Sequence, residues 1–226
     1  MNSEKKIAIF DLDGTLVSSH LWLGLAKYYF KKKENIFPTL WFIISHLSFL
    51  PFWKMGLIPT EKYYKSWVKD MSQIMRGIRL DREKEIFNWL TDNYLLPTLK
   101  NNVFDRLKQH QKDGFLTILI SGSFQNLLDI IANRLNIDFA IGTKLEMVKD
   151  KFSGKIIPPV CFGQEKMKMV KSFLNEKNLK INFKESFSYS DSVFDLPILE
   201  FVGNPVVVEP DKNLLSVAKN KGWEII

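Results

Sequence analysis

The stretch IAIFDLDGTLV, at residues 7 to 17, constrains the fold of this chain more than any other feature. A short apolar run with charge on one side and a turn signal on the other predicts a buried strand. The run ends in Asp11 and Asp13, and Gly14 follows at once. Because burying an ionised carboxylate without a partner is costly, we expect other groups to pair with both aspartates.

Further strand patterns alternate with helical patterns after residue 98. The strand patterns are FLTILISGS at 115–123, residues 137–141, ESFSYSDS at 185–192, PVVVEP at 205–210 and WEII at 223–226. Residues 142–156 predict a hairpin that turns near residues 150–154. Strands that alternate with helices are typical of parallel strands joined by crossovers, so we predict a doubly wound, Rossmann-like α/β sheet.

Polar residues close three of these strands, namely Asp11, Ser121 and Asp191. Ligands of doubly wound sheets bind beyond the carboxyl ends of the strands. We therefore expect these three side chains to share one site.

The alternation is interrupted by a long segment with helical apolar stripes and no clear strand pattern. We predict a core domain formed by residues 1–16 and 99–226, and a helical cap domain formed by residues 17–98. The cap would be inserted directly after the first strand.

One stretch of this insertion, residues 36–53, contains no Asp, Glu, Lys or Arg and is just long enough to cross a bilayer. Two prolines, two serines and His46 interrupt it. A single crossing would also separate Asp11 from Ser121 and Asp191. A buried or partly exposed cap helix is therefore favoured over membrane contact, and a helix lying at a membrane surface is the alternative.

Length, charge and cysteine content limit the class of protein. A chain of 226 residues with 46% apolar residues can bury a sizeable core. The net charge of +7 comes from dispersed lysines, which indicates a solvated surface and no nucleic-acid partner. Cys161 is the one cysteine and the amino terminus lacks the apolar region of a secretory signal, so we expect a cytoplasmic protein.

Four motifs in order, DLDGTLV, ISGS, GQEK and SDSVFDLP, resemble the signature of the haloacid-dehalogenase superfamily over nearly the whole chain. The position of the insertion is similar to that in subfamily IB, the branch that includes phosphoserine phosphatase and has a small helical C1 cap. This resemblance implies a magnesium-dependent phosphatase acting on a small phosphorylated substrate.

The residue chemistry agrees with that resemblance. A carboxylate such as Asp11 can attack a phosphoryl group and form an aspartyl-phosphate, which divides hydrolysis into two easier steps. Asp13 would protonate the leaving oxygen and then activate water.

Phosphate and metal ligands follow from the other motifs. Lys166 supplies a positive charge, and Ser121 and Gly122 supply hydrogen-bond donors for phosphate. Asp191 and Asp11 would hold Mg²⁺, with the backbone carbonyl of Asp13 as the family implies. Asp195 would support the metal or orient Lys166.

The chain departs from the phosphoserine enzymes at two positions. Those enzymes carry a glutamate where this chain has His20, and an asparagine where it has Phe194. With the many aromatic residues of the cap, these changes favour a lipid-derived or alcohol phosphate over phosphoserine. Arg76 and Arg79 are candidates for contact with a second anionic group of the substrate.

Three alternatives remain open at this stage. A phosphotransferase or phosphomutase would use the same intermediate with another acceptor. A binding module would keep the fold without turnover. A membrane-associated enzyme would act on lipid phosphates.

Overall fold

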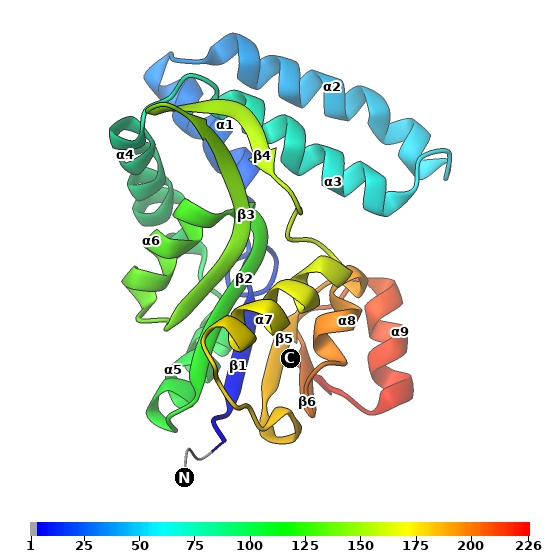
Figure 1. The fold of residues 1–226 in the computed structure, drawn as a ribbon. Helices are drawn as coiled ribbons and strands as arrows, with labels where there is room; N and C mark the ends of the chain where they lie inside the picture. Colours follow the sequence, from blue (N-terminus) through cyan, green and yellow to red (C-terminus); the bar gives the residue numbers. More distant parts are fainter. Residues whose placement is uncertain (1–3) are drawn as a thin grey trace.

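The structure is a computed structural model that describes residues 4–226. Seven strands form one sheet in the order β4-β3-β2-β1-β5-β6-β7, and all neighbours are parallel except β3 and β4. The strands are β1 (Ile7–Asp11), β2 (Leu116–Phe124), β3 (Phe139–Val148), β4 (Lys151–Ile157), β5 (Phe187–Ser190), β6 (Asn204–Val207) and β7 (Glu224–Ile225). The predicted doubly wound α/β core is confirmed (Figure 1).

Nine α-helices lie within residues 4–226. Four belong to the predicted cap segment: α1 (Leu21–Lys32), α2 (Ile36–Lys54), α3 (Thr60–Met71) and α4 (Leu80–Leu90). Five follow it: α5 (Asn101–Lys112), α6 (Gln125–Leu135), α7 (Gln164–Glu176), α8 (Leu196–Leu199) and α9 (Lys212–Lys221). Short helical turns occupy η1 (Ser72–Met75), η2 (Thr91–Leu95), η3 (Leu96–Thr98), η4 (Phe183–Glu185) and η5 (Val193–Asp195).

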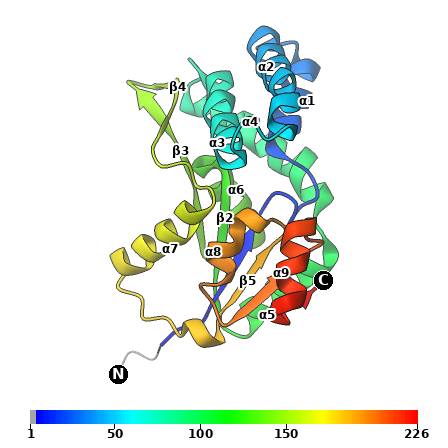
Figure 2. The same ribbon diagram turned by 90° about the vertical axis from the view of Figure 1, so that its right-hand side faces the viewer.

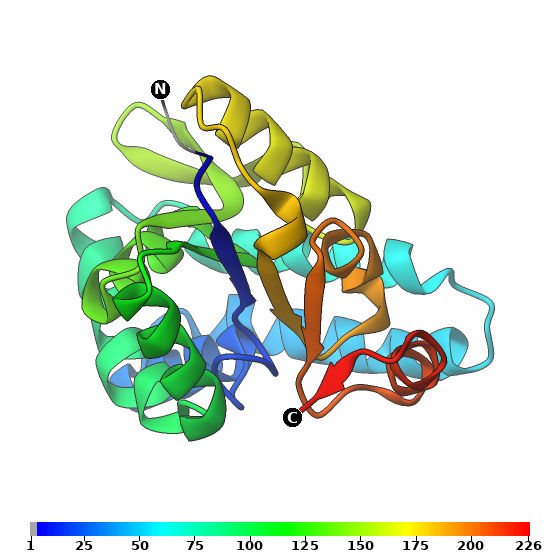
Figure 3. The same ribbon diagram turned by 90° about the horizontal axis from the view of Figure 1, so that it is seen from below.

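The first strand is buried on both faces, which explains its continuous apolar sequence. Ile7 and Ile9 pack with the apolar residues of α7 and α8, while Ala8 and Phe10 pack with those of α5 and α6. The view from below shows α5 and α7 on opposite faces of the sheet (Figure 3). Because β1 is central and held on both sides, the residue at its end has a fixed position.

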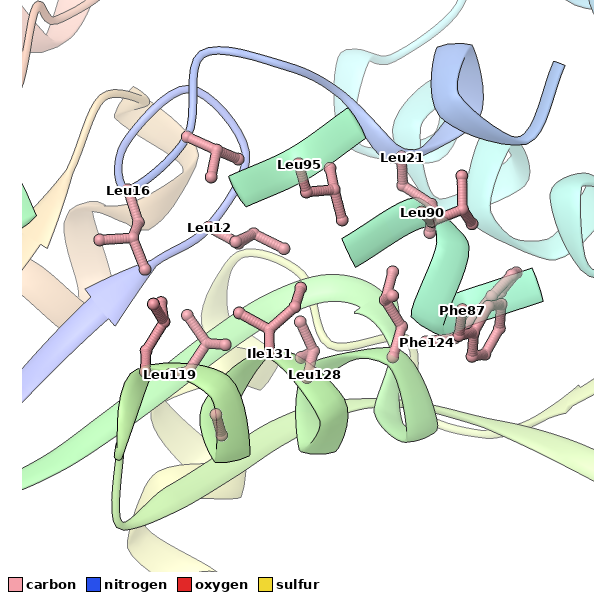
Figure 4. Close-up of a cluster of buried hydrophobic side chains, with 14 of the residues drawn as sticks. Leu12, Leu16, Leu21, Phe87, Leu90, Leu95, Leu119, Phe124, Leu128 and Ile131 are labelled. Atoms are coloured by element: carbon pink, nitrogen blue, oxygen red, sulfur yellow. The ribbon is translucent and has the colours of Figure 1, made fainter. Parts of the chain in front are cut away.

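The apolar core continues from the sheet into the cap. Figure 4 shows Leu12 of the loop after β1, Leu90 of α4 and Leu128 of α6 in one buried cluster. The loop after β1, which joins the core to the cap, is therefore buried. The cap helix α4 lies on the side of the cap that faces the sheet. The division at residues 17 and 98 remains a prediction.

The hairpin of β3 and β4 also reaches the cap, as Figure 2 shows. The Ser72 hydroxyl donates to the carbonyl of Gly154 at 2.8 Å, and the Gly77 N–H donates to the carbonyl of Phe152 at 2.8 Å. The predicted turn near residues 150–154 was placed too late, because the chain turns at Lys149 and Asp150 and Gly154 lies within β4. Gly154 is needed there because a Cβ would collide with Gln73 and Arg76.

The charge-free segment 36–53 forms a cap helix, α2, as predicted. It packs inward through Thr39, Phe42 and His46 and exposes most of its other side chains. Within residues 4–226, α2 is the helix whose length and composition suffice to cross a membrane, a test that core helices of soluble proteins also pass. Figures 1 and 2 place α2 at the end of the molecule farthest from β1.

Candidate active site

The parallel sheet brings the predicted residues together at one edge. Asp11 ends β1, and the neighbours of β1 are β2, which contains Ser121, and β5, which Asp191 follows. Lys166 is the third residue of α7 and lies against the same edge. The sequence predicted that these residues lie together, because the carboxyl ends of parallel strands are at the same edge of a sheet.

A buried ion-pair network forms the floor of the site. The Nζ of Lys166 lies 2.6 Å from Oδ1 of Asp11 and 2.7 Å from Oδ2 of Asp195. The hydroxyl of Ser190 donates to the same Oδ2 at 2.6 Å. Asp11, Lys166 and Asp195 are each at most 6% exposed. Asp195 therefore orients Lys166 toward Asp11.

Burial and mutual charge govern the ionisation of this network. Burial alone lowers the pKa of Lys166, but the carboxylates of Asp11 and Asp195 outweigh burial and raise that pKa above its ordinary value. Burial raises the pKa of Asp11, with Lys166 acting against it and Asp195 and Asp191 adding to it. The Lys166 ammonium therefore stays charged, and the carboxylates repel one another.

The carboxylate of Asp13 is held from both parts of the molecule. Its Oδ2 accepts hydrogen bonds from the hydroxyls of Ser121 and Ser123, each at 3.0 Å. Its Oδ1 accepts the backbone N–H of Leu21, the first residue of α1, at 3.1 Å. The sequence predicted that Asp13 has partners, and these partners are two hydroxyl groups and the N-terminus of one helix.

Gly14 allows Asp191 to approach the loop after β1. Gly14 has a φ of +88°, a conformation that favours glycine, and a Cβ at this position would collide with the Asp191 carboxylate. Oδ1 of Asp191 accepts the Thr15 hydroxyl at 2.9 Å. Burial raises the pKa of Asp191, and the hydrogen bond from Thr15 opposes that shift.

Hydrogen bonds hold the backbone of the ISGS loop, residues 120–123, in place. The Ser123 N–H donates to Oγ of Ser121 at 3.0 Å, and the Thr143 hydroxyl donates to the carbonyl of Gly122 at 2.9 Å. Cys161 is fully buried near this loop, and burial raises the pKa of its thiol to about 12. A buried thiol with a raised pKa is a packing residue and not a nucleophile.

The donor set fits Mg²⁺ better than a metal bound only by side chains. Among residues 4–226, no three His, Cys, Asp or Glu side chains form a ready metal cluster. The cavity residues include four aspartates and one lysine, so negative charge is in excess. Mg²⁺ characteristically takes one or two carboxylates together with waters and a substrate phosphate. Two carboxylates and one backbone carbonyl are suitable for that role.

A cavity of about 490 Å³ lies over these residues. His20, a candidate substrate contact of the cap, contributes to its wall. Its other lining side chains from the cap and the facing loops are mostly apolar: Leu21, Trp22, Leu50, Trp53, Tyr63, Tyr64, Trp67, Val68, Met71, Phe162 and Phe194. The cavity thus has a charged floor, formed by the aspartates and Lys166, and a mostly apolar roof.

Arg76 and Arg79 are not among the residues that line this cavity. Arg79 pairs with Asp150 and lies 3.5 Å from Asp81, beside a second cavity near α4. The side chain of Arg76 lies near Gly154 of β4. The structure therefore does not bring these two arginines to the aspartates.

Several contributors to the site were missed from the sequence. Ser190 and Thr15 hold the two aspartates of the last motif, and Lys100 donates to the carbonyl of Gly14 at 2.6 Å. Tyr64 stacks on Phe162 with ring centroids 5.6 Å apart. Two signals were available: Thr15 and Ser190 lie within the motifs DLDGTLV and SDSVFDLP, and Phe162 immediately precedes GQEK.

Comparisons with known proteins agree with this geometry. The sequence model described as haloacid dehalogenase-like hydrolase matches residues 8–200, and the chain belongs to this family. The chain is 26% identical over 227 residues to a histidinol-phosphatase of Neisseria meningitidis serogroup C (strain 8013), with 98% of each chain covered. The predicted family and enzyme class are confirmed.

A second relative and two solved structures extend the comparison. Phosphoserine phosphatase SerB1 of Mycobacterium tuberculosis is 28% identical over 226 residues, which cover 96% of this chain and 69% of that protein. A protein of unknown function from Bordetella pertussis Tohama I superposes with a TM-score of 0.84 at 21% identity, with 99% of each chain covered. A phosphoserine phosphatase with a phospho-aspartyl intermediate analogue superposes with a TM-score of 0.64 at 16% identity, covering 99% of this chain and 93% of that one. These structural likenesses establish the shared fold.

Proposed function

We propose that this protein is a magnesium-dependent phosphatase that hydrolyses a small phosphomonoester through an aspartyl-phosphate on Asp11. The observation that carries the proposal is the placement of Asp11, Asp13 and Lys166 in one cavity, with Lys166 2.6 Å from Asp11. The phosphatase names of the relatives support it.

In the first step, a carboxylate oxygen of Asp11 attacks phosphorus. A bond forms between that oxygen and phosphorus, and the bond from phosphorus to the ester oxygen breaks. Asp13, in its acid form, gives its proton to the departing oxygen. The Ser121 and Ser123 hydroxyls and the Leu21 N–H keep the Asp13 carboxyl in place for this transfer.

In the second step, Asp13 takes a proton from a water molecule that attacks the same phosphorus. The bond from phosphorus to Asp11 breaks and inorganic phosphate leaves. Asp13 is restored to its acid form, so one residue serves both steps.

Positive charge and donors offset the repulsion between the phosphate and the carboxylates. Lys166 supplies the charge, and the N–H of Gly122 supplies a hydrogen bond. The Ser121 hydroxyl has one hydrogen, so it donates to the phosphate when it turns away from Asp13, which the Ser123 hydroxyl and the Leu21 N–H still hold. Asp11, Asp191 and the backbone carbonyl of Asp13 would hold Mg²⁺. When bound, Mg²⁺ neutralises charge on the phosphate oxygens. Asp195 acts through Lys166.

The substrate that fits this cavity is an alcohol phosphate with an apolar organic part. Tyr64, Phe162 and Phe194 lie with ring centroids 5.2 to 5.6 Å apart and join the cap to the core beside the aspartates. His20 stands where the phosphoserine enzymes carry a glutamate. These residues offer no anion to the ammonium group of phosphoserine, but they offer apolar area.

Phosphate release from an aryl phosphate tests the reaction. Wild-type protein is assayed with Mg²⁺ and with EDTA. The Asp11→Asn variant, which keeps the shape of the side chain and removes its charge, is assayed with Mg²⁺. We expect release that requires both Mg²⁺ and Asp11. Release that is indifferent to Asp11 would contradict the proposal.

A substrate panel tests the substrate class. We expect higher kcat/KM for alkyl phosphates than for phosphoserine, and a shift of about tenfold toward polar phosphates in Phe194→Asn. Phe194→Leu, which keeps an apolar side chain, is the matched control and should retain the preference. A wild-type preference for phosphoserine over every apolar phosphate would overturn the assignment.

A further inference from the structure

The outward side of α2 is a large apolar surface without a protein partner in the described chain. We define the outer α2 face by Phe37, Trp41, Ile44, Leu47 and Phe52, which are 78%, 67%, 59%, 52% and 50% exposed. From Ile36 to Trp53 the helix carries no charged residue. A contiguous exposed surface of this kind is typical of a site that binds another apolar surface.

Positive charge lies at both ends of this face. Lys32 and Lys33 precede α2, Lys54 is its last residue, and Lys62 follows in the first turn of α3; all four are exposed. Within residues 4–226 these four lysines form no ion pair, whereas the nearby acids Glu34 and Glu61 pair with Arg82 and Lys65. The apolar face therefore has uncompensated cations at each end.

This charge pattern disfavours a second copy of the chain as the occupant. A two-fold pairing of antiparallel α2 helices would bring Lys32 and Lys33 of one copy to Lys54 and Lys62 of the other. Like charges would then face each other at both ends of the interface. An anionic surface instead complements both ends.

The inner side of α2 is held by polar and aromatic contacts with α3. The Tyr63 hydroxyl donates to the carbonyl of His46 at 3.2 Å, and Nε2 of His46 lies 3.3 Å from Asp70. The ring of Trp53 stacks on Tyr63 at 5.2 Å. A spanning helix would have to leave these contacts, while a helix lying flat keeps them.

We propose that the outer α2 face docks on an anionic lipid bilayer. Phe37, Trp41, Ile44 and Phe52 enter the boundary between headgroups and acyl chains, and the flanking lysines face the lipid phosphates. The docking does not depend on the proposed reaction, because no residue of the outer α2 face lines the cavity. It places the cavity close to the bilayer, since Leu50 and Trp53 of the same helix form part of its wall.

Vesicle flotation of the full-length Asp11→Asn protein tests the proposal without turnover. Vesicles contain phosphatidylglycerol with phosphatidylcholine, or phosphatidylcholine alone. We expect flotation with the anionic vesicles that falls at least tenfold in Phe37→Ser/Trp41→Ser/Ile44→Ser. The control Val148→Ser/Ile157→Ser removes exposed apolar side chains from the hairpin of β3 and β4 and should float normally. Absence of flotation in the parent protein, or equal flotation of both variants, would overturn the proposal.

Three further measurements exclude loss of folding and self-association as explanations. Lys32→Glu/Lys33→Glu should lose anionic flotation, while Lys108→Glu/Lys112→Glu on α5 should keep it. Brominated lipids should quench the fluorescence of the parent protein much more than that of Trp41→Phe, which should still float. A dimer in light scattering that dissociates in the triple serine variant would contradict lipid docking, because a second copy would then cover the face.

Discussion

The carboxylate of Asp13 accepts the backbone N–H of Leu21 at 3.1 Å and thereby caps the cap helix α1. His20 occupies the N-cap position of α1 and makes no side-chain capping bond. The proposed acid and base is therefore also the group that satisfies the first turn of the cap. Catalysis and cap position are linked through one side chain.

Substitutions at Asp13 separate these two roles. Both Asp13→Asn and Asp13→Ala should lower kcat on phosphate esters of poor leaving groups by about 10² to 10⁴-fold. Asp13→Ala should also lower the free energy of unfolding by about 1 kcal/mol more than Asp13→Asn, because asparagine keeps an oxygen acceptor for the Leu21 N–H. Urea denaturation measures that difference, and equal stability of the two variants would contradict the capping role.

Removal of Lys166 should destabilise the protein as well as inactivate it. Lys166→Met leaves the carboxylates of Asp11 and Asp195 buried without their cation, which we expect to cost about 3 kcal/mol. Lys168→Met is the matched control on the same helix, since Lys168 is 55% exposed and pairs with Glu165. Its cost should be below about 1 kcal/mol. Similar urea midpoints for the two variants would show that the buried network contributes no stability.

The buried Glu83 of α4 should make the free energy of unfolding depend on pH. It is 1% exposed, and burial raises its pKa to about 7, with Asn126 and Lys84 acting against the shift. The folded protein thus favours the protonated carboxyl. The resulting stabilisation is complete below the unfolded pKa of about 4.3 and is lost as pH rises through about 7.

Glu83→Gln removes this titration. We expect the variant to exceed the wild type in unfolding free energy by about 3 to 4 kcal/mol at pH 8 and to come within about 1 kcal/mol of it near pH 4.5. Glu176→Gln, at an exposed position of α7, should leave the pH dependence of the wild type unchanged. A stability difference between Glu83→Gln and wild type that is constant across this range would refute the assignment.

Gly14→Ala tests the close approach of Asp191. The substitution imposes an unfavourable positive φ and displaces the Asp191 carboxylate, so we expect more Mg²⁺ to be needed for half-maximal activity. Gly114→Ala has a similar φ of +76° with open space around it. It should lose about 1 kcal/mol of stability with no change in the Mg²⁺ requirement. Equal Mg²⁺ titrations would show that Asp191 does not depend on Gly14.

Local sequence patterns were sufficient to predict the core of the fold. The apolar run at Ile7–Asp11 is buried on both faces, so its strand pattern was unambiguous. The meeting of Asp11, Ser121 and Asp191 followed from parallel topology alone. The long β3 was less predictable, because its second half lies on the edge hairpin, where burial alternates.

Other features of the site and the cap could not be predicted, because they depend on how distant segments pack together. That Ser121 and Ser123 bind Asp13, over 100 residues away in the sequence, depends on the register of β1 and β2. Aromatic residues at helical spacing usually pack into a core, yet Trp41, Phe49 and Phe52 of α2 are each at least 50% exposed. An apolar helix carries no local signal for which of its sides other elements cover. The position of Arg79 likewise depends on the hairpin of β3 and β4, which it meets at Asp150.

Trapping the covalent intermediate tests the central claim most directly. Protein turning over a radiolabelled aryl phosphate with Mg²⁺ is quenched in acid, and its peptides are mapped for label. We predict label on Asp11 in the wild type, none in Asp11→Asn, and more in Asp13→Asn, because an aryl leaving group needs no acid while release of phosphate from Asp11 still needs the base. Turnover without label on Asp11, or label on another residue, would contradict the account.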